Sequence, residues 1–181
     1  ASAASCEHAG PDKRDPGRRQ MIDLRPFETL ATFANDWLDT YRQFGFGDFH
    51  DPARTGFGPR LKWNDDRIRP QTGFPMHPHR DMEIITYVRS GAITHEDNLG
   101  NRGRTEAGDV QVMSAGTGIM HAEMNLEDEV TTIFQIWIMT DAPGHSPRWE
   151  ARKLPTEPCQ ESLVVLASGR PGDADDPGAP M

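Results

Sequence analysis

The sequence predicts an all-β fold, a sandwich or barrel of short strands, and three observations lead to this prediction. From Gly73 onward, short runs rich in isoleucine, threonine, tyrosine and valine alternate with glycine or Asx residues. These interruptions recur every several residues, which is typical of β-sandwiches and barrels. The longest β-branched and aromatic run, Thr131 to Met139, is predicted to form a central strand.

The two ends of the chain differ in composition from this middle part. Residues 1–20 are small, charged and punctuated by proline and glycine, so we expect a disordered leader or added residues there. Met21 begins a different composition and has the character of a natural start. The folded domain is therefore expected over residues 21–167, and the Gly/Pro/Asp-rich residues 168–181 are expected to be a disordered tail.

The first part of the domain is expected to contain a short helix and a strand. Between Phe27 and Gln43, large apolar residues recur at spacings of three and four, which predicts a short amphipathic helix. Arg60 to Asn64 alternates between polar and apolar residues and is predicted to be a strand. A turn at residues 64–66, Asn-Asp-Asp, is predicted to end that strand.

Beyond Gly73 the expected elements are strands and turns. Turns are predicted at residues 97–101 and 105–109, where Asx and glycine residues cluster. Residues 143–158 are expected to form a polar connection with Trp149 and Leu154 as anchors. The strands in this part are predicted at Met82 to Val88, Ala92 to Glu96, Val110 to Met113, Thr131 to Met139 and Leu163 to Ala167.

Composition and charge exclude several classes of protein. The chain has 28 acidic and 19 basic residues and a net charge of -9, which argues against a nucleic-acid backbone as a direct partner. Its two cysteines, Cys6 and Cys159, give neither a disulfide framework nor a thiolate zinc site. The apolar runs are too short to span a bilayer, and the first 20 residues lack the apolar segment of a signal peptide. A cytoplasmic protein is the expectation.

Two pairs of metal-ligating residues stand at strand spacing. His77 and His79 are two residues apart, as are His121 and Glu123. Because residues i and i+2 of a strand share a face, each pair can point in one direction from its strand. If the two strands face each other, three imidazoles and one carboxylate converge, a set that suits Fe, Mn, Co, Ni, Cu or Zn as divalent ion.

The residues around these pairs resemble the two cupin motifs and, more narrowly, the bacterial branch of the pirin family. The segments HPHRDMEIITYV, from His77, and SAGTGIMHAEMN, from Ser114, carry the closer resemblance. The resemblance covers roughly Met21 to Leu166. The motif positions in this sequence are Gly73, His77, His79, Glu83 and Gly91, then Gly108, Gly116, His121 and Asn125.

The resemblance implies a cupin jelly-roll β-barrel that holds one mononuclear metal, iron in most members. The family's ligands match His77, His79, His121 and Glu123. Glu83 stands where generic cupins place a glutamate ligand, and the sequence leaves open whether it supports the metal site or lies outside the pocket. Bacterial members are associated with quercetin 2,3-dioxygenase activity, and mammalian members are described as iron-dependent transcriptional co-regulators.

In one respect the chain departs from the family pattern. Pirins carry a second, degraded cupin domain, whereas this sequence offers one predicted strand after Pro158 and then the tail. The second domain is expected to be missing or truncated. The barrel face left uncovered would then favour self-association or a protein partner.

Two functions follow from these residues as hypotheses. In the first, the protein is a dioxygenase that cleaves a flavonol with O2, and Glu123 serves as both ligand and general base for the substrate's 3-hydroxyl. In the second, it is a non-enzymatic iron-binding module that regulates a protein partner. Fe(II) is the expected metal, although the general order of metal affinities favours Cu, Ni or Zn outside a controlled cell.

Overall fold

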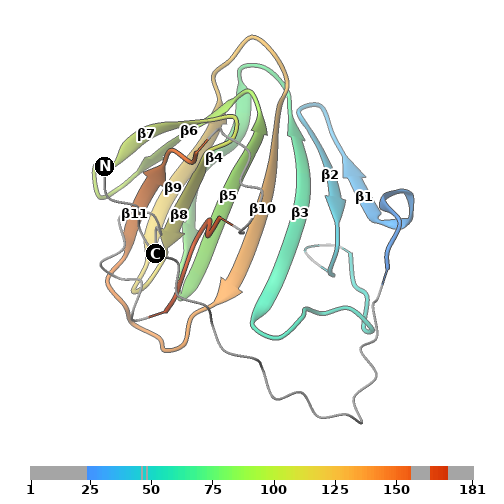
Figure 1. The fold of residues 1–181 in the computed structure, drawn as a ribbon, viewed down its shortest axis with the longest axis horizontal. Coiled ribbons are helices and arrows are strands. Elements are labelled where there is room, and N and C mark those ends of the chain that lie inside the picture. The colour runs from blue at the N-terminus through green and yellow to red at the C-terminus, as the bar shows by residue number, and fades with distance from the viewer. Residues whose placement is uncertain (1–23, 46, 48, 156–163, 171–181) are drawn as a thin grey trace, which may run out of the picture.

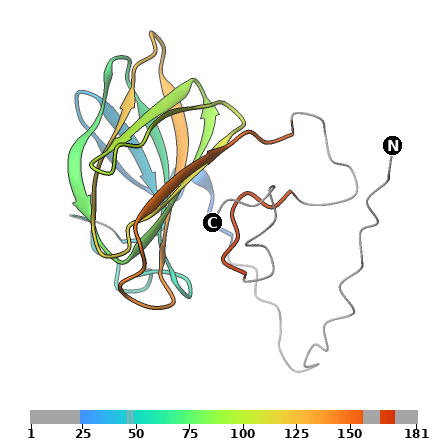
Figure 2. The same cartoon turned by 90° about the vertical axis from the view of Figure 1, so that its left-hand side faces the viewer.

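The structure, a computed structural model, describes residues 24–45, 47, 49–155 and 164–170, and within them the fold is two facing β-sheets (Figures 1 and 2). This is the jelly-roll cupin fold, although the two sheets do not close into one continuous hydrogen-bonded barrel. The large sheet has the strand order β1-β2-β3-β10-β5-β8-β11. Its strands are β1 (Ala31–Ala34), β2 (Leu38–Arg42), β3 (Arg60–Ile68), β5 (Met82–Ser90), β8 (Val110–Ser114), β10 (Thr131–Met139) and β11 (Arg148–Arg152).

The small sheet carries the residues of the two sequence motifs. Its order is β4-β9-β6-β7, and all its pairings are antiparallel. Its strands are β4 (Thr72–His79), β6 (Ala92–Asp97), β7 (Arg102–Glu106) and β9 (Ile119–Asn125). At one edge the sheets approach closely, because a Cβ on Gly103 of β7 would lie 2.2 Å from the Trp149 ring of β11.

The space between the sheets is layered. One apolar cluster contains Leu38, Ile68, Val88, Ile93 and Ile133, and a second contains Ile84, Met113, Ala115 and Ile119. Between them lies a set of buried polar side chains that we call the polar layer: Thr86, Gln111, His121, Glu123 and Gln135. The strand period produces the layers, since the inward residues of β5 are successively Ile84, Thr86 and Val88.

Most predicted strands and turns after Gly73 are confirmed. β10 has the predicted bounds and is the fourth of the seven strands in the large sheet, running down its middle in Figure 1. Neither β7 nor β11 was predicted from the sequence. β11 lies within the residues expected to be a polar connection, and its Trp149 packs against the second apolar cluster as the predicted anchor.

Two predictions in the first part of the domain are wrong. Instead of a helix over Phe27 to Gln43, the chain has a 3-10 turn at Phe27–Thr29 followed by the hairpin β1–β2. The side chain of Asn35 accepts hydrogen bonds from the backbone N–H groups of Trp37 and Leu38, which makes the hairpin turn. β2 then pairs with β3, and this long-range pairing outweighs the helical spacing.

Two further predictions are corrected. Residues 64–66 do not form a turn but continue β3, which is paired with β2 on one side and β10 on the other. Their polar side chains are tolerated inside the strand because Asn64 and Asp66 point into the polar interior. The strand predicted from Leu163 to Ala167 is absent from residues 164–167, and Leu163 lies outside the described residues. Residues 1–20, 171–181 and both cysteines also lie outside them.

None of the helices in the described part of the chain has the length and apolar character needed to cross a bilayer.

Candidate metal centre

Three histidines from two strands bring their ring nitrogens together. His77 and His79 come from β4 and His121 from β9, and one ring nitrogen of each lies within 4.8 Å of the others. The convergence expected if the two strands face each other is reached in another way. The two strands are hydrogen-bonded neighbours in the small sheet, with His77 directly opposite His121. Directly opposite residues share a face, so this pairing places the imidazoles side by side.

β4 is an edge strand, and this explains how it holds two prolines beside the histidines. Its pairing with β9 shifts register between Phe74 and His77, where Pro75 lies. The shift places the Pro75 carbonyl 2.7 Å from His77 Nδ1. A carbonyl only accepts, so His77 Nδ1 carries a proton, and Nε2 is the nitrogen that can bind a metal.

The cluster fits a metal ion in spacing and in charge. His77 Nε2 and His121 Nε2 are 3.1 Å apart, and two nitrogens bonded at about 2.1 Å to one metal are separated by about 3.0–3.4 Å at ordinary ligand angles. Burial, and then the neighbouring imidazoles, lower the pKa of His79 to about 4 and that of His121 to about 3. Both rings are therefore neutral at pH 7, the form that binds metals.

Glu123 points into the interior from the same face of β9 as His121. It is 1% exposed, and its carboxylate oxygens do not belong to the group of donor atoms within 4.8 Å that the three histidines form in the described chain. Oε1 accepts hydrogen bonds from Thr86 Oγ1 (3.0 Å) and Gln111 Nε2 (2.6 Å), and Oε2 accepts one from Gln135 Nε2 (2.7 Å). This carboxylate is held in one orientation by three donors from the large sheet.

The two glutamines are themselves oriented. Lys62 Nζ donates to Gln135 Oε1 (2.7 Å), and Thr105 Oγ1 donates to Gln111 Oε1 (2.9 Å). Each contact turns the amide so that its NH2 group faces Glu123. Burial lowers the pKa of Lys62 to about 8, against the opposing effects of Asp66 and Glu123.

These supporting residues were not predicted from the sequence, although the sequence contains a pattern that indicates them. Thr86, Gln111 and Gln135 are polar residues in the middle of runs that otherwise read as buried strands. A polar side chain at an inward strand position needs a partner, so each indicates a buried polar site.

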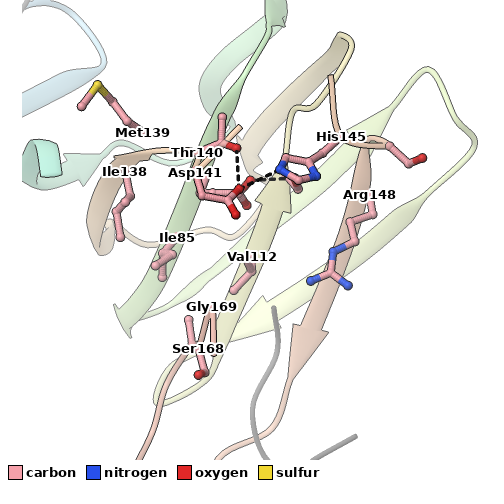
Figure 3. Close-up of a pocket in the computed structure, with 14 residues that line it drawn as sticks. Ile85, Val112, Ile138, Met139, Thr140, Asp141, His145, Arg148, Ser168 and Gly169 are labelled. Carbon is pink, nitrogen blue, oxygen red and sulfur yellow. Dashed lines mark hydrogen bonds and ion pairs between the residues drawn. The ribbon is translucent and has the colours of Figure 1, made fainter. Parts of the chain in front are cut away.

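Glu83 lies away from the histidines, on the outer face of the large sheet. It accepts a hydrogen bond from Ser114 Oγ (2.7 Å). It helps to line a cavity of about 500 Å³, with walls formed by Ile85, Val112 and His145 among others (Figure 3). Glu83 and His79 are four residues apart and would share a face if they lay on one strand. They do not, because the chain leaves the small sheet for the large one at Asp81, where φ is +47°.

A second, shallow cavity is lined by one histidine of the cluster. It has a volume of about 390 Å³, and His79 is the histidine of the cluster that lines it, next to Arg80 and Met120. On the inner side, His79 makes an edge-to-face contact with Trp137 at 4.9 Å between ring centroids.

Comparison with known proteins connects this site to one family. The family model described as Pirin matches residues 23–138. A pirin-like protein of Caulobacter vibrioides is 56% identical over 155 residues, covering 86% of this chain and 67% of the relative. The quercetin 2,3-dioxygenase of Escherichia coli K12 is 43% identical over 148 residues, covering 81% of this chain and 63% of the relative. The chain thus spans about two thirds of the length of these relatives.

Solved structures agree with the sequence comparison. The crystal structure of YhhW from Escherichia coli superposes with a TM-score of 0.80 at 40% identity, covering 89% of this chain and 67% of that one. The crystal structure of the bacterial pirin YhhW in complex with nickel(II) gives a TM-score of 0.71 at 44% identity, covering 73% of this chain and 58% of that one.

Proposed function

This chain belongs to the pirin family, and from that premise we propose that it binds one divalent transition metal and acts on a flavonol as a quercetin 2,3-dioxygenase-type oxidoreductase. The proposed ligands are His77, His79, His121 and Glu123. The observation that carries the proposal is the convergence of three ring nitrogens within 4.8 Å. The nickel(II) complex of a bacterial pirin supports a divalent ion at such a site.

The donor set is compatible with Fe(II) as the proposed metal. Imidazole and carboxylate ligands together suit Fe(II), and they also accept Ni, Cu, Zn, Mn or Co. When bound, a metal of this kind supplies Lewis acidity that lowers the pKa of a coordinated hydroxyl, and it supplies a site for O2 chemistry.

Glu123 is the proposed acceptor of the proton from the substrate's 3-hydroxyl. Its Oε2 accepts one hydrogen bond, from Gln135, and so keeps capacity for a second partner. Thr86 and Gln111 hold the other oxygen, so the carboxylate can receive a proton without losing its position. The Trp137 ring beside His79 provides an apolar wall that excludes water from this side and suits an aromatic substrate.

The outer-face cavity favours a second candidate function, an iron-binding module that regulates a protein partner. Apolar residues including Ile85, Val112, Ile138 and Met139 line this cavity, on the sheet face that points away from the histidines. A partner bound there would contact β5, β8 and β10, the strands that also hold Glu123 from inside.

The test is turnover by metal-loaded protein. The metal-free chain would be reconstituted with Fe(II) without oxygen, metal content measured, and O2 uptake with quercetin followed by oxygen electrode. One metal per chain with quercetin-dependent O2 uptake is the expected result. One metal per chain without turnover would favour the regulatory module, and failure to bind any divalent metal would overturn both.

A further inference from the structure

A line of buried side chains leads from the histidine cluster to β6 and is not used by the proposed reaction. His95 has 0% of its surface exposed and Asp97 6%. Asp97 Oδ2 lies 3.0 Å from His95 Nε2, and His95 Nδ1 lies 3.5 Å from His121 Nδ1. We propose that Asp97 and His95 are positioning residues that hold His121 in the tautomer whose Nε2 lone pair faces the metal. This inference rests on the proposed metal site.

The proton positions follow from Asp97, because a carboxylate only accepts hydrogen bonds. Its Oδ1 accepts from the backbone N–H groups of Leu99 (2.9 Å) and Asn101 (3.0 Å), and Oδ2 accepts from Asn101 Nδ2 (2.9 Å). The contact between Asp97 Oδ2 and His95 Nε2 therefore needs a proton on His95 Nε2.

The proton on His95 determines the position of the proton on His121. In the tautomer with its proton on Nε2, His95 has a lone pair on Nδ1, and this atom faces His121 Nδ1. The His121 Nδ1 must then carry a proton, and since a neutral imidazole has only one, His121 Nε2 keeps its lone pair. This Nε2 is the atom 3.1 Å from His77 Nε2, and the Pro75 carbonyl independently places a proton on the other nitrogen of His77, Nδ1. With both protons on Nδ1, the two Nε2 atoms are the ones that can bind a cation.

His95 is also fixed in orientation. Its ring is stacked on Trp149, with centroids 4.7 Å apart and planes within 7°. Trp149 in turn fits against Gly103, where any Cβ would lie 2.2 Å from the indole ring. The stacked indole restrains the plane of the imidazole, and the contact with Asp97 sets which ring nitrogen faces that carboxylate.

The Asp97→Asn variant is designed to reverse this order. Two backbone N–H groups face the Oδ1 position, so the oxygen of the new amide stays there and its NH2 faces His95 Nε2. His95 would then carry its proton on Nδ1 and donate to His121, which would move the His121 proton to Nε2. The expected result is a 10- to 100-fold loss of Ni(II) affinity, the usual scale for residues that orient a metal ligand.

Two measurements decide the proposal. Nitrogen-15 chemical shifts of the histidine rings in the metal-free wild-type protein at pH 7 report the tautomers directly. The expected tautomers are Nδ1–H for His121 and Nε2–H for His95, and both should switch in Asp97→Asn. Ni(II) titration then gives the affinities, with thermal unfolding of each metal-free variant as the check on folding.

The His95 position offers a rescue experiment. In His95→Gln, the amide NH2 can donate to Asp97 while the amide oxygen accepts from His121 Nδ1, so the order is preserved. His95→Gln is therefore expected to bind Ni(II) more tightly than His95→Leu. Asp51→Asn is the matched control, because Asp51 Oδ1 also accepts a backbone N–H two residues later, that of Ala53 at 3.0 Å, but among the described residues it has no hydrogen bond or ion pair with the histidines of the cluster. It should bind Ni(II) as the wild type does.

A proton on His121 Nε2 in the wild type, a doubly protonated His95 at pH 7, or unchanged Ni(II) affinity in a folded Asp97→Asn protein would each overturn the proposal. If Asp97→Asn does not fold, the proposal is still tested by the tautomers of the wild-type protein and by the Ni(II) affinities of the two His95 variants. Failure of the wild type to bind Ni(II) would overturn the proposed metal site instead. The tautomers of the metal-free protein would remain measurable in that case.

Discussion

The interior of this protein contrasts two kinds of layer built on the same strands. In the apolar cluster that contains Ile68, Val88 and Ile133, these three side chains are 0% exposed. One inward position further along β5 and β10, Thr86 and Gln135 instead donate hydrogen bonds to a buried carboxylate. Apolar contacts have no preferred direction, so the first layer needs only the right volume. The polar layer needs each donor to face its acceptor.

This difference explains how the fold can hold a metal site without depending on it. The apolar layers on either side supply stability that survives changes at the site. The polar layer supplies orientation, since Lys62 and Thr105 turn the glutamines toward Glu123. We therefore expect substitutions in the apolar layers to lower stability without changing metal binding, and substitutions in the polar layer to change both.

Removing a cluster histidine should give the largest effect on metal binding. His121→Ala deletes the imidazole that lies 3.1 Å from His77 and opposite it in the sheet. Tight binding of Ni(II) or Fe(II), and any O2 uptake with quercetin, should be lost. Calorimetric titration and an oxygen electrode measure this, with His145→Ala, a substitution on the other sheet face, as the control. Unchanged turnover in His121→Ala would refute the assignment of the site.

Breaking the polar layer should produce the largest loss of stability. Gln135→Leu removes a donor to Glu123 and an acceptor for Lys62, both buried and charged. We expect the free energy of unfolding to fall by about 3–5 kcal/mol, because two buried charged groups each lose a hydrogen bond worth about 1.5–3 kcal/mol. Denaturant unfolding of the metal-free protein measures it. A loss below about 1 kcal/mol would show that the polar layer is not tightly ordered.

A matched pair of substitutions tests the apolar layer. Ile133 is 0% exposed, so Ile133→Ala should lower the free energy of unfolding by about 2–5 kcal/mol and Ile133→Val by about 0.5–1.5 kcal/mol. Neither should change the number of metal ions bound per chain. A graded loss of metal affinity across this pair would contradict the separation of the two layers.

The pH dependence of the metal-free protein should give a smaller and more gradual effect. The folded pKa of His79 is about 4 and that of His121 about 3, against 6.5 for an ordinary histidine. Below pH 6.5 the unfolded chain takes up protons that the folded chain excludes, so stability falls as the pH falls. For the buried His121 the slope approaches about 1.4 kcal/mol per pH unit.

Chemical denaturation at pH 7.5, 6.5 and 5.5 measures this slope. The His121→Ala variant should show a shallower pH dependence, because the group with the lowest pKa of the pair is gone. An unchanged slope in that variant would place the titrating groups elsewhere in the protein.

The fold and the site differ in how far the sequence predicts them. Strand alternation and turn residues predicted most of the strands after Gly73, since both are local properties of the chain. The same local rules failed over residues 27–43, where spacings of three and four coexist with the strand pattern of β2. The choice of strand there depends on pairing with β3, more than 20 residues later.

At the site, the sequence by itself determined that the members of each ligand pair, two residues apart, share a strand face, because side chains in a strand alternate with a fixed period of two. Only the tertiary structure decided that β4 and β9 are neighbours, that Glu83 turns to the outer face, and that Gln111 and Gln135 hold Glu123. These facts depend on which distant strands pair and in which register. Residue spacing within one strand carries no information about its partner, so the orientation of the polar layer emerges only when the sheets are assembled.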